Sequence, residues 1–176
     1  MEAIKEFTIP FVGLKDGKHH FEFLIDNTFF AHFEFNDFDQ ATLNGILTLD
    51  KKSSFLELHF QIIGPVVLPC DVSTELFNYQ IETAFDLIVK FGVPPSNPSD
   101  EILILSEGSY QIDVSHYFYE MVVLALPQKR VHPGIEDGTL KSEIVEKLKV
   151  LEPKETHLKG SEDPRWNKLK DLLYKG

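Results

Sequence analysis

The sequence predicts an α+β fold: an antiparallel, strand-rich region in the N-terminal two-thirds of the chain, one main helix packed against it, and a helical C-terminal tail. Three observations lead to this prediction. Apolar and polar positions alternate through most of the first hundred residues, short polar turns separate the alternating segments, and one segment with helical spacing of apolar residues follows them. Because no helical crossover separates the alternating segments, we expect neighbouring strands to pair antiparallel.

The first strands are predicted from period-two alternation. It runs through residues 20–24 and again through residues 29–35, where Phe33 and Phe35 alternate with His32. Side chains two apart on a strand share a face, so both segments are expected to be half-buried strands.

A hairpin is expected next, because the polar turn 50–54 separates two apolar segments, 43–49 and 55–63. Gly64 and Pro65 interrupt the second of these segments. Since proline has no amide donor, this point is predicted to be a strand edge, a bulge or a bend.

The best helix of the sequence follows two further predicted strands, at residues 76–89 and 102–105. Asp113 is a suitable N-cap, apolar residues recur three and four positions apart after it, and the pattern stops before a proline. We therefore place the main helix at residues 113–126, covering one face of the sheet in a domain of residues 1–127.

Residues 128–176 are predicted to form a linker and a helical tail. Segment 128–138 contains little apolar material and is expected to be an extended or mobile connection, followed by a short helix at residues 141–151. In the last predicted helix, Asp163 is a good N-cap and Pro164 suits the first helical position.

Charge is distributed unevenly along the chain. Residues 1–127 hold 6 Lys or Arg and 19 Asp or Glu, a net formal charge of −13, whereas residues 128–176 hold 11 and 9, a net of +2. Broad contact with nucleic acid needs many lysines and arginines to displace counterions from the phosphates. The acidic body therefore favours a basic protein as partner over bare RNA.

The cysteine content and the hydropathy pattern predict a cytoplasmic protein. Cys70 is the single cysteine, so the chain cannot form an internal disulfide or a multi-cysteine zinc site. No apolar run approaches the length of a membrane span, and no secretory segment is evident at the start of the sequence.

Three segments carry a resemblance to a known family. A strand leads into Cys70, a helix begins at Ile112-Asp113 and ends in Leu-x-Leu-Pro at Pro127, and a box of Asp163, Pro164, Arg165 and Trp166 is followed by Leu169. In this order and spacing they resemble the large ribosomal RNA subunit accumulation protein family (YceD-like), over roughly residues 64–172. The resemblance implies a part in the synthesis, processing or stability of large-subunit ribosomal RNA. It names a process and no reaction.

One position departs from the pattern of that family, which carries a Cys-x-x-Cys pair. Ser73 stands where the second cysteine is expected, so Cys70 has no thiol partner. A thiol and a hydroxyl make a poor zinc site and a poor redox pair. We therefore expect neither a metal nor a cofactor here.

The box in the tail has two interpretations. It can be a purely structural helix start, capped by Asp163 and anchored by Trp166. Alternatively it contacts a partner, since arginine beside tryptophan is enriched at interaction hot spots. The partner-binding residues would then be Asp163, Pro164, Arg165, Trp166 and Leu169.

Catalytic chemistry has little support in the sequence. The sequence contains no Gly-rich phosphate loop, HExxH or GxSxG signature, and no small-molecule substrate is indicated. Histidine–carboxylate pairs share a face at His20/Glu22, His32/Glu34 and His116/Glu120. Such pairs arise readily from the polar alternation of an exposed face and from surface contacts on a helix.

These observations lead to one preferred hypothesis and two alternatives. We prefer a non-enzymatic factor in large-subunit biogenesis that acts through a basic partner, a ribosomal protein or another biogenesis factor. The first alternative is direct binding of ribosomal RNA by the tail, using Lys159, Arg165, Trp166, Lys168, Lys170 and Lys175. The second is an enzyme that uses Cys70, or a histidine with an acidic residue.

Overall fold

The computed structural model describes residues 4–93, 101–140 and 142–151. The chain divides into two compact units, Met1–Leu140 and Lys141–Gly176. Within the second unit the described residues include one helix, α4 (Glu143–Leu151), close to the predicted helix 141–151.

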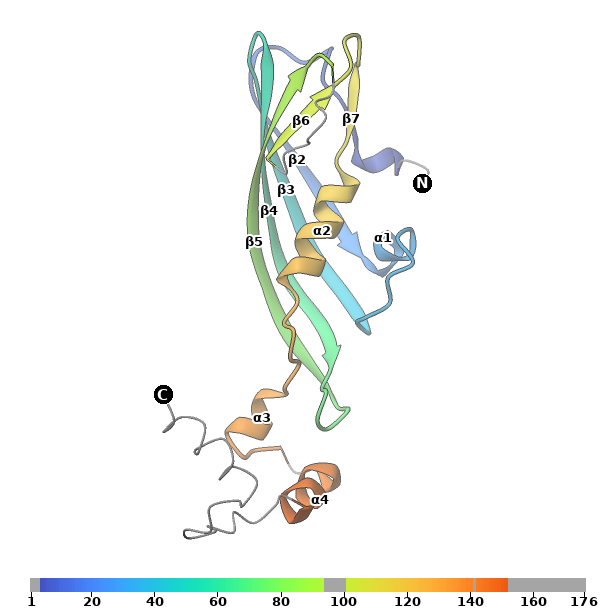
Figure 1. Cartoon of the computed structure of the whole chain (residues 1–176), viewed down its shortest axis with the longest axis vertical. Coiled ribbons are helices and arrows are strands. Elements are labelled where there is room, and N and C mark those ends of the chain that lie inside the picture. Colours follow the sequence, from blue (N-terminus) through green and yellow to red (C-terminus); the bar gives the residue numbers. More distant parts are fainter. Residues whose placement is uncertain (1–3, 94–100, 141, 152–176) are drawn as a thin grey trace, which may run out of the picture. The chain divides into compact units, whose positions relative to one another are not determined.

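The first unit is built on a five-stranded sheet (Figure 1). Its order is β2 (Gly17–Asp26), β3 (Gln40–Lys51), β4 (Phe55–Pro69), β5 (Leu76–Phe91) and β6 (Ile102–Leu105). The first four strands pair antiparallel, as predicted from their short connections. The short edge strand β6 pairs parallel to β5, so the antiparallel prediction does not extend to this edge.

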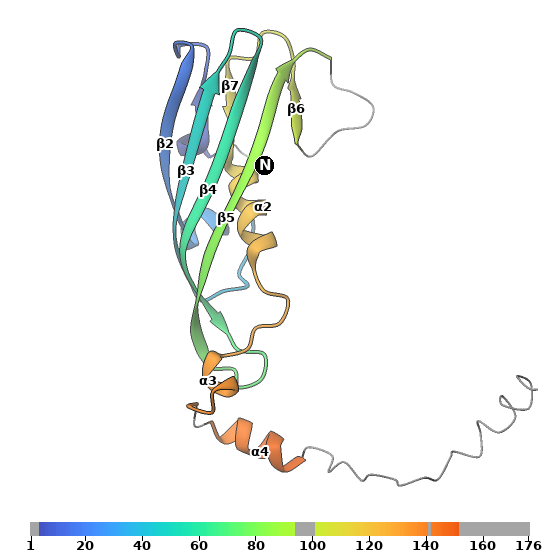
Figure 2. The same cartoon turned by 90° about the vertical axis from the view of Figure 1, so that its left-hand side faces the viewer.

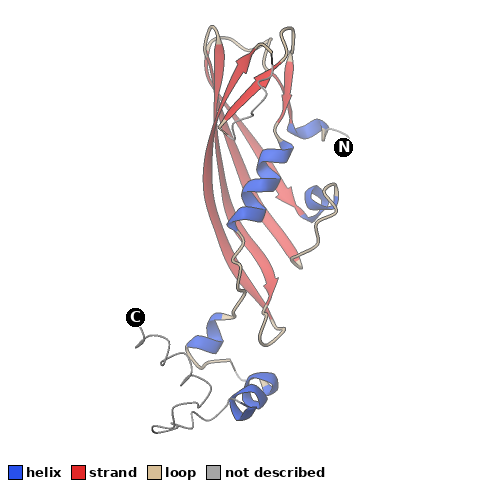
Figure 3. Cartoon of the chain, in the orientation of Figure 1, coloured by secondary structure: helices blue, strands red, loops and turns tan. Residues whose placement is uncertain are grey.

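One face of the sheet is covered by α2 (Ser115–Ala125), which matches the predicted main helix (Figures 2 and 3). Beside it, β1 (Thr8–Pro10) pairs with β7 (Gln111–Asp113) in a separate two-stranded sheet that follows the short 3-10 helix Lys5–Phe7. Asp113 accepts the backbone N–H of Ser115 at 2.9 Å and the Ser115 hydroxyl at 2.7 Å. The aspartate selected from the sequence thus stabilises the start of the helix.

Phenylalanine rings fill the core between α2 and the sheet. Phe118 of α2 lies against Phe60 of β4, with ring centroids 5.3 Å apart, and against Phe23 of β2 at 5.1 Å. Phe7 adds a ring stacked on Phe23 at 4.8 Å. Aromatic pairs at these distances stabilise the core beyond the area that they bury.

The predicted strand at residues 29–35 is wrong. The chain forms the short helix α1 (Asn27–Ala31) and a turn there, because the Asp26 carboxylate accepts the amide N–H groups of Thr28 and Phe29. Phe29 is buried as expected, but it belongs to this helix and not to a strand. An N-cap with two amide donors outweighs the weak local preference of the alternating sequence.

Gly64 and Pro65 lie inside β4, which is a central strand and not an edge. The ladder with β5 continues past them, but the ladder with β3 is interrupted opposite Thr42 and Leu43 and resumes in the same register. Gly64 has φ of +152°, and a Cβ there would lie 2.5 Å from the Thr42 carbonyl oxygen. The predicted irregularity is therefore a local break in pairing on one side of the strand.

The segment 128–138, expected to be a linker, is attached to the sheet unit. It contains α3 (Pro133–Glu136). Arg130 hydrogen-bonds to Asp37 in the α1–β3 connection and to Asp71 in the β4–β5 connection, and the His132 amide donates to Cys70 in the latter. These contacts place it in the first compact unit, which extends to Leu140, beyond the predicted boundary at residue 127.

Candidate functional site

The sheet face opposite α2 is open to solvent along β2, β3, β4 and β5. No helix or strand within described residues 4–93 and 101–140 covers it (Figure 2). Side chains alternate along each strand, so the odd positions of β4 and the even positions of β2, β3 and β5 point to this face. We call it the open face.

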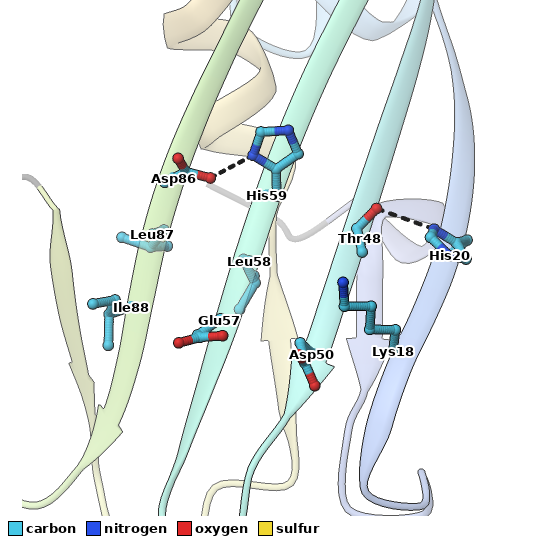
Figure 4. A pocket seen from close by; sticks show the side chains of 10 residues that line it. All are labelled: Lys18, His20, Thr48, Asp50, Glu57, Leu58, His59, Asp86, Leu87 and Ile88. Atoms are coloured by element: carbon cyan, nitrogen blue, oxygen red, sulfur yellow. Dashed lines mark hydrogen bonds and ion pairs between the residues drawn. The ribbon is translucent and has the colours of Figure 1, made fainter.

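A shallow hollow lies on the open face where four strands run side by side (Figure 4). One row across the strands joins His20, Thr48, His59 and Asp86 in register. The ring Nδ1 of His20 hydrogen-bonds the Thr48 hydroxyl at 3.0 Å, and Nδ1 of His59 pairs with Asp86. Both histidines are therefore oriented by a neighbour from the next strand.

The adjacent row carries three further charged residues of the hollow: Lys18, Asp50 and Glu57. Lys52, from the turn after β3, lies 2.7 Å from the Asp50 carboxylate and 3.8 Å from that of Glu57. The hydrogen bond to Asp50 raises the pKa of the Lys52 ammonium. Lys52 and Glu57 are exposed and Asp50 is half-buried, so these surface pairs contribute little to folding stability.

Hydrogen bonding and ion pairing are the chemistry that this hollow can supply. The Asp86–His59 pair resembles an oriented base. Among the described residues that line the hollow, however, only Thr48 has a hydroxyl, and that hydroxyl is bonded to His20 instead. Within the described part of the chain, no three His, Cys, Asp or Glu side chains are placed to hold a metal ion. The arrangement suits recognition of a ligand by its charge and shape.

The predicted histidine–carboxylate pairs lie in different settings. His20 and Glu22 are both exposed on the open face, as polar alternation predicts. His116 and Glu120 form an exposed ion pair on α2, with Nε2 and Oε1 3.0 Å apart. His32 is the C-cap of α1 and Glu34 lies in the turn that follows, with φ of +54°, so the two do not share the face of a strand.

Cys70 lies in the turn between β4 and β5 and is buried. Its sulfur accepts three backbone N–H groups: those of Val72 and Ser73 at 3.4 Å and that of His132 at 3.3 Å. Burial alone would raise the pKa of the thiol, but the Ser73 hydroxyl and these amides outweigh it and lower the pKa below its ordinary value. The turn thus makes this thiol more acidic than an ordinary cysteine thiol.

The sequence could not reveal which residues contact this turn. Asp71 accepts the Arg130 amide at 2.8 Å and donates its own amide to the Arg130 carbonyl at 2.7 Å. The Arg130 guanidinium donates to the backbone carbonyl of Asp37 at 2.8 Å and to its carboxylate at 3.1 Å. Arg130 therefore fastens the chain after α2 to two connections of the sheet.

His132 also fastens the chain after α2 to the sheet unit. Its ring packs edge-on against Phe77 of β5, with centroids 5.7 Å apart, and its Nδ1 accepts the Gly134 amide at 2.9 Å. Ser73 is buried beside Cys70, at the position where the family pattern has a second cysteine. Its hydroxyl accepts the Glu75 amide at 3.4 Å, so it holds the turn by hydrogen bonding.

The predicted partner-binding residues Asp163, Pro164, Arg165, Trp166 and Leu169 lie outside the described residues, as do the lysines of the predicted RNA-binding tail.

A family model matches residues 58–173, which include β4 from Leu58 onward, β5, α2, the Cys70 turn and the box at residues 163–169. Its description is large ribosomal RNA subunit accumulation protein YceD. The chain belongs to this family. The match begins near the point where the sequence resemblance was placed, and β1–β3 precede it. No curated protein and no solved structure matches the chain.

The YceD family is described by a process, the accumulation of large-subunit ribosomal RNA, and not by a reaction. Among the helices that the structure describes, none is both long and apolar enough to cross a membrane. Family membership thus points to a role in the accumulation of large-subunit ribosomal RNA.

Proposed function

We propose that this protein supports the accumulation of large-subunit ribosomal RNA as a non-enzymatic, cytoplasmic factor that binds a basic protein. The observation that carries the proposal is the match of the YceD family model over residues 58–173. A protein that gathers or protects an assembling ribosomal protein needs a binding surface and no catalytic centre.

Charge supports a basic protein as the partner. Residues 1–127, which include the whole five-stranded sheet, carry a net charge of −13. Such a field attracts lysine- and arginine-rich proteins and repels bare RNA, and it acts on the rate of association. Binding should therefore weaken as salt rises and the Debye length falls below about 8 Å.

The tail box is proposed as a second contact with the partner. Arg165 beside Trp166 supplies the residue types that dominate interaction hot spots. Trp166→Ala in the full chain should then leave the thermal unfolding midpoint nearly unchanged and abolish partner recovery. A fall of many degrees in the midpoint would instead show that Trp166 is buried in the fold.

The test in cells is the ratio of large- to small-subunit ribosomal RNA in a strain that lacks the protein. We expect the ratio to fall and to recover when the wild-type gene is returned. An unchanged ratio during growth would contradict the proposed function.

The test in solution compares two probes for the purified full chain: RNA-free proteins extracted from large ribosomal subunits, and ribosomal RNA fragments, both at 50 mM salt. We expect binding to the proteins alone. Binding to RNA alone would favour the alternative in which the lysines of the tail contact phosphates.

A further inference from the structure

We infer that the centre of the open face is a docking surface for an extended, basic segment of a partner protein. Its apolar part consists of Leu24, Ile46 and Ile63, and the carboxylates of Glu22 and Glu82 lie on either side. This inference rests on the proposed function, because it specifies where the basic partner binds.

Exposed apolar side chains mark this place. Leu24 is 65% exposed and Ile63 is 48% exposed, although both belong to strands of the sheet. Leu24 is in register with Asn44, and Asn44 with Ile63, so the two apolar side chains lie on either side of one asparagine. Ile46 lies two residues from Asn44 on the same strand, diagonal to both. Contiguous exposed apolar side chains with polar residues around them favour an interaction site over a freely solvated surface.

The nearest carboxylates define the charge of the occupant. Glu22 is in register with Ile46, and Glu82 is in register with Ile63. Neither forms an ion pair within the described residues. Lys18 is four residues from Glu22, about 13 Å along β2. Two carboxylates beside an apolar cluster fit a segment that carries both lysine or arginine and apolar side chains.

The geometry predicts the spacing within that segment. Glu22 on β2 and Glu82 on β5 are separated by three strand spacings across the sheet and by two residues along the strands. The distance between their backbone positions is therefore about 16 Å. An extended chain covers this distance in about five residues. We therefore expect basic residues about five positions apart, with apolar residues between them over Leu24, Ile46 and Ile63.

Other occupants fit this surface less well. The phosphates of RNA would meet Glu22 and Glu82 and be repelled. A second copy of the chain, placed by a two-fold axis, would bring like carboxylates together while each chain carries a net charge of −11.

Photo-crosslinking tests this surface directly. Asn44→Cys in the full chain, combined with Cys70→Ala so that the introduced thiol is the one that is labelled, carries a photoreactive group between Leu24 and Ile63. RNA-free proteins of the large ribosomal subunit serve as the binding mixture, with ribosomal RNA as a separate arm. Glu107→Cys, at an exposed turn away from this surface, is the matched control.

Charge-reversal variants then distinguish binding of the partner at Glu22 and Glu82 from attraction of the partner by the net charge of the chain. Glu22→Lys with Glu82→Lys should lower the crosslink yield at Asn44 at least about tenfold. Glu6→Lys with Glu107→Lys changes the net charge equally at other exposed sites and should retain most of the yield. Ile63→Ser should reduce the yield, whereas Leu124→Ser, an exposed position on α2, should not.

A crosslink to an identified Lys- and Arg-rich protein, lost in the Glu22/Glu82 pair and kept in the control pair, supports the docking surface. A crosslink to RNA or to a second copy, equal losses in both charge pairs, or no crosslinked product would overturn it. The ribosomal RNA ratio of the deletion strain reports on the proposed function separately. A lowered ratio with no crosslink at Asn44 would therefore refute this surface alone.

Discussion

Gly45 of β3 lies directly against the ring of Phe118 from α2. A Cβ built on Gly45 would lie 2.8 Å from Cε1 of Phe118 and 2.9 Å from Cδ1 of Ile25. Because Gly45 has no side chain, the ring of Phe118 can pack directly against the backbone of β3. Because interiors are close-packed, neither neighbour can withdraw without opening space elsewhere.

Gly45→Ala should therefore destabilise the protein by about 1–3 kcal/mol, measured by chemical denaturation. Combined with Phe118→Leu, the loss should be smaller than the sum of the two single changes, because the smaller side chain makes room. Gly13→Ala is the control, since a Cβ there meets nothing within 4 Å. Equal effects at Gly13 and Gly45 would contradict the packing argument.

Asp26→Ala should cost about 1 kcal/mol at pH 7, because α1 loses its N-cap. The Thr28 hydroxyl and the amides of Phe29 and Thr28 lower the pKa of Asp26, against a smaller effect of burial. A carboxyl whose pKa is lowered by folding stabilises the protein above its unfolded pKa of about 3.9. The difference in unfolding free energy between the wild type and Asp26→Ala should therefore shrink as the pH falls through the lowered pKa. A difference that stays constant from pH 7 to pH 2 in denaturation experiments would refute this.

Arg130→Gln should loosen the segment after α2. The variant loses the guanidinium hydrogen bonds to Asp37 and keeps the backbone bonds to Asp71. We expect a loss of about 1 kcal/mol and faster amide exchange at residues 130–135 than in the wild type. Lys129→Gln, a neighbouring exposed residue, should leave exchange unchanged.

The Cys70 thiol should react with iodoacetamide along a pH profile that begins below that of an ordinary cysteine, although its burial slows the reaction at every pH. Burial would raise the pKa of this thiol, but the Ser73 hydroxyl and three amides lower it overall. Ser73→Ala should move the inflection of the profile to higher pH. An unmoved inflection would show that Ser73 does not stabilise the thiolate.

Most of the sheet could be predicted from the sequence because its determinants are local. Alternation and a polar turn at residues 50–54 predicted the β3–β4 hairpin, and apolar spacing with Asp113 predicted α2. The helix α1 was missed because five residues are too short to show helical periodicity, while Phe29–Phe35 happens to alternate. The Asp26-Asn27-Thr28 sequence, a capping signal, would have corrected it.

The contacts of the candidate site could be predicted only in part. Once a hairpin register is known, residues on neighbouring strands follow by counting, which brings Thr48 opposite His59. Arg130 and Asp37 are 93 positions apart, and no local pattern joins them. The parallel pairing of β6 with β5 could not be predicted either. A connection without a helical crossover favours antiparallel pairing, and β6 is an exception.

The gap opposite Gly64 and Pro65 divides the hydrogen bonding of β3 and β4 into two cooperative blocks. One long block runs from Asn44 to Lys51, and a short one at Gln40 and Ala41 adjoins the end that carries the Cys70 turn. Because opening free energies differ between such blocks, the short block is expected to unfold locally while the long one stays intact. The thiol of Cys70 would then meet solvent through a local opening that costs less free energy than global unfolding.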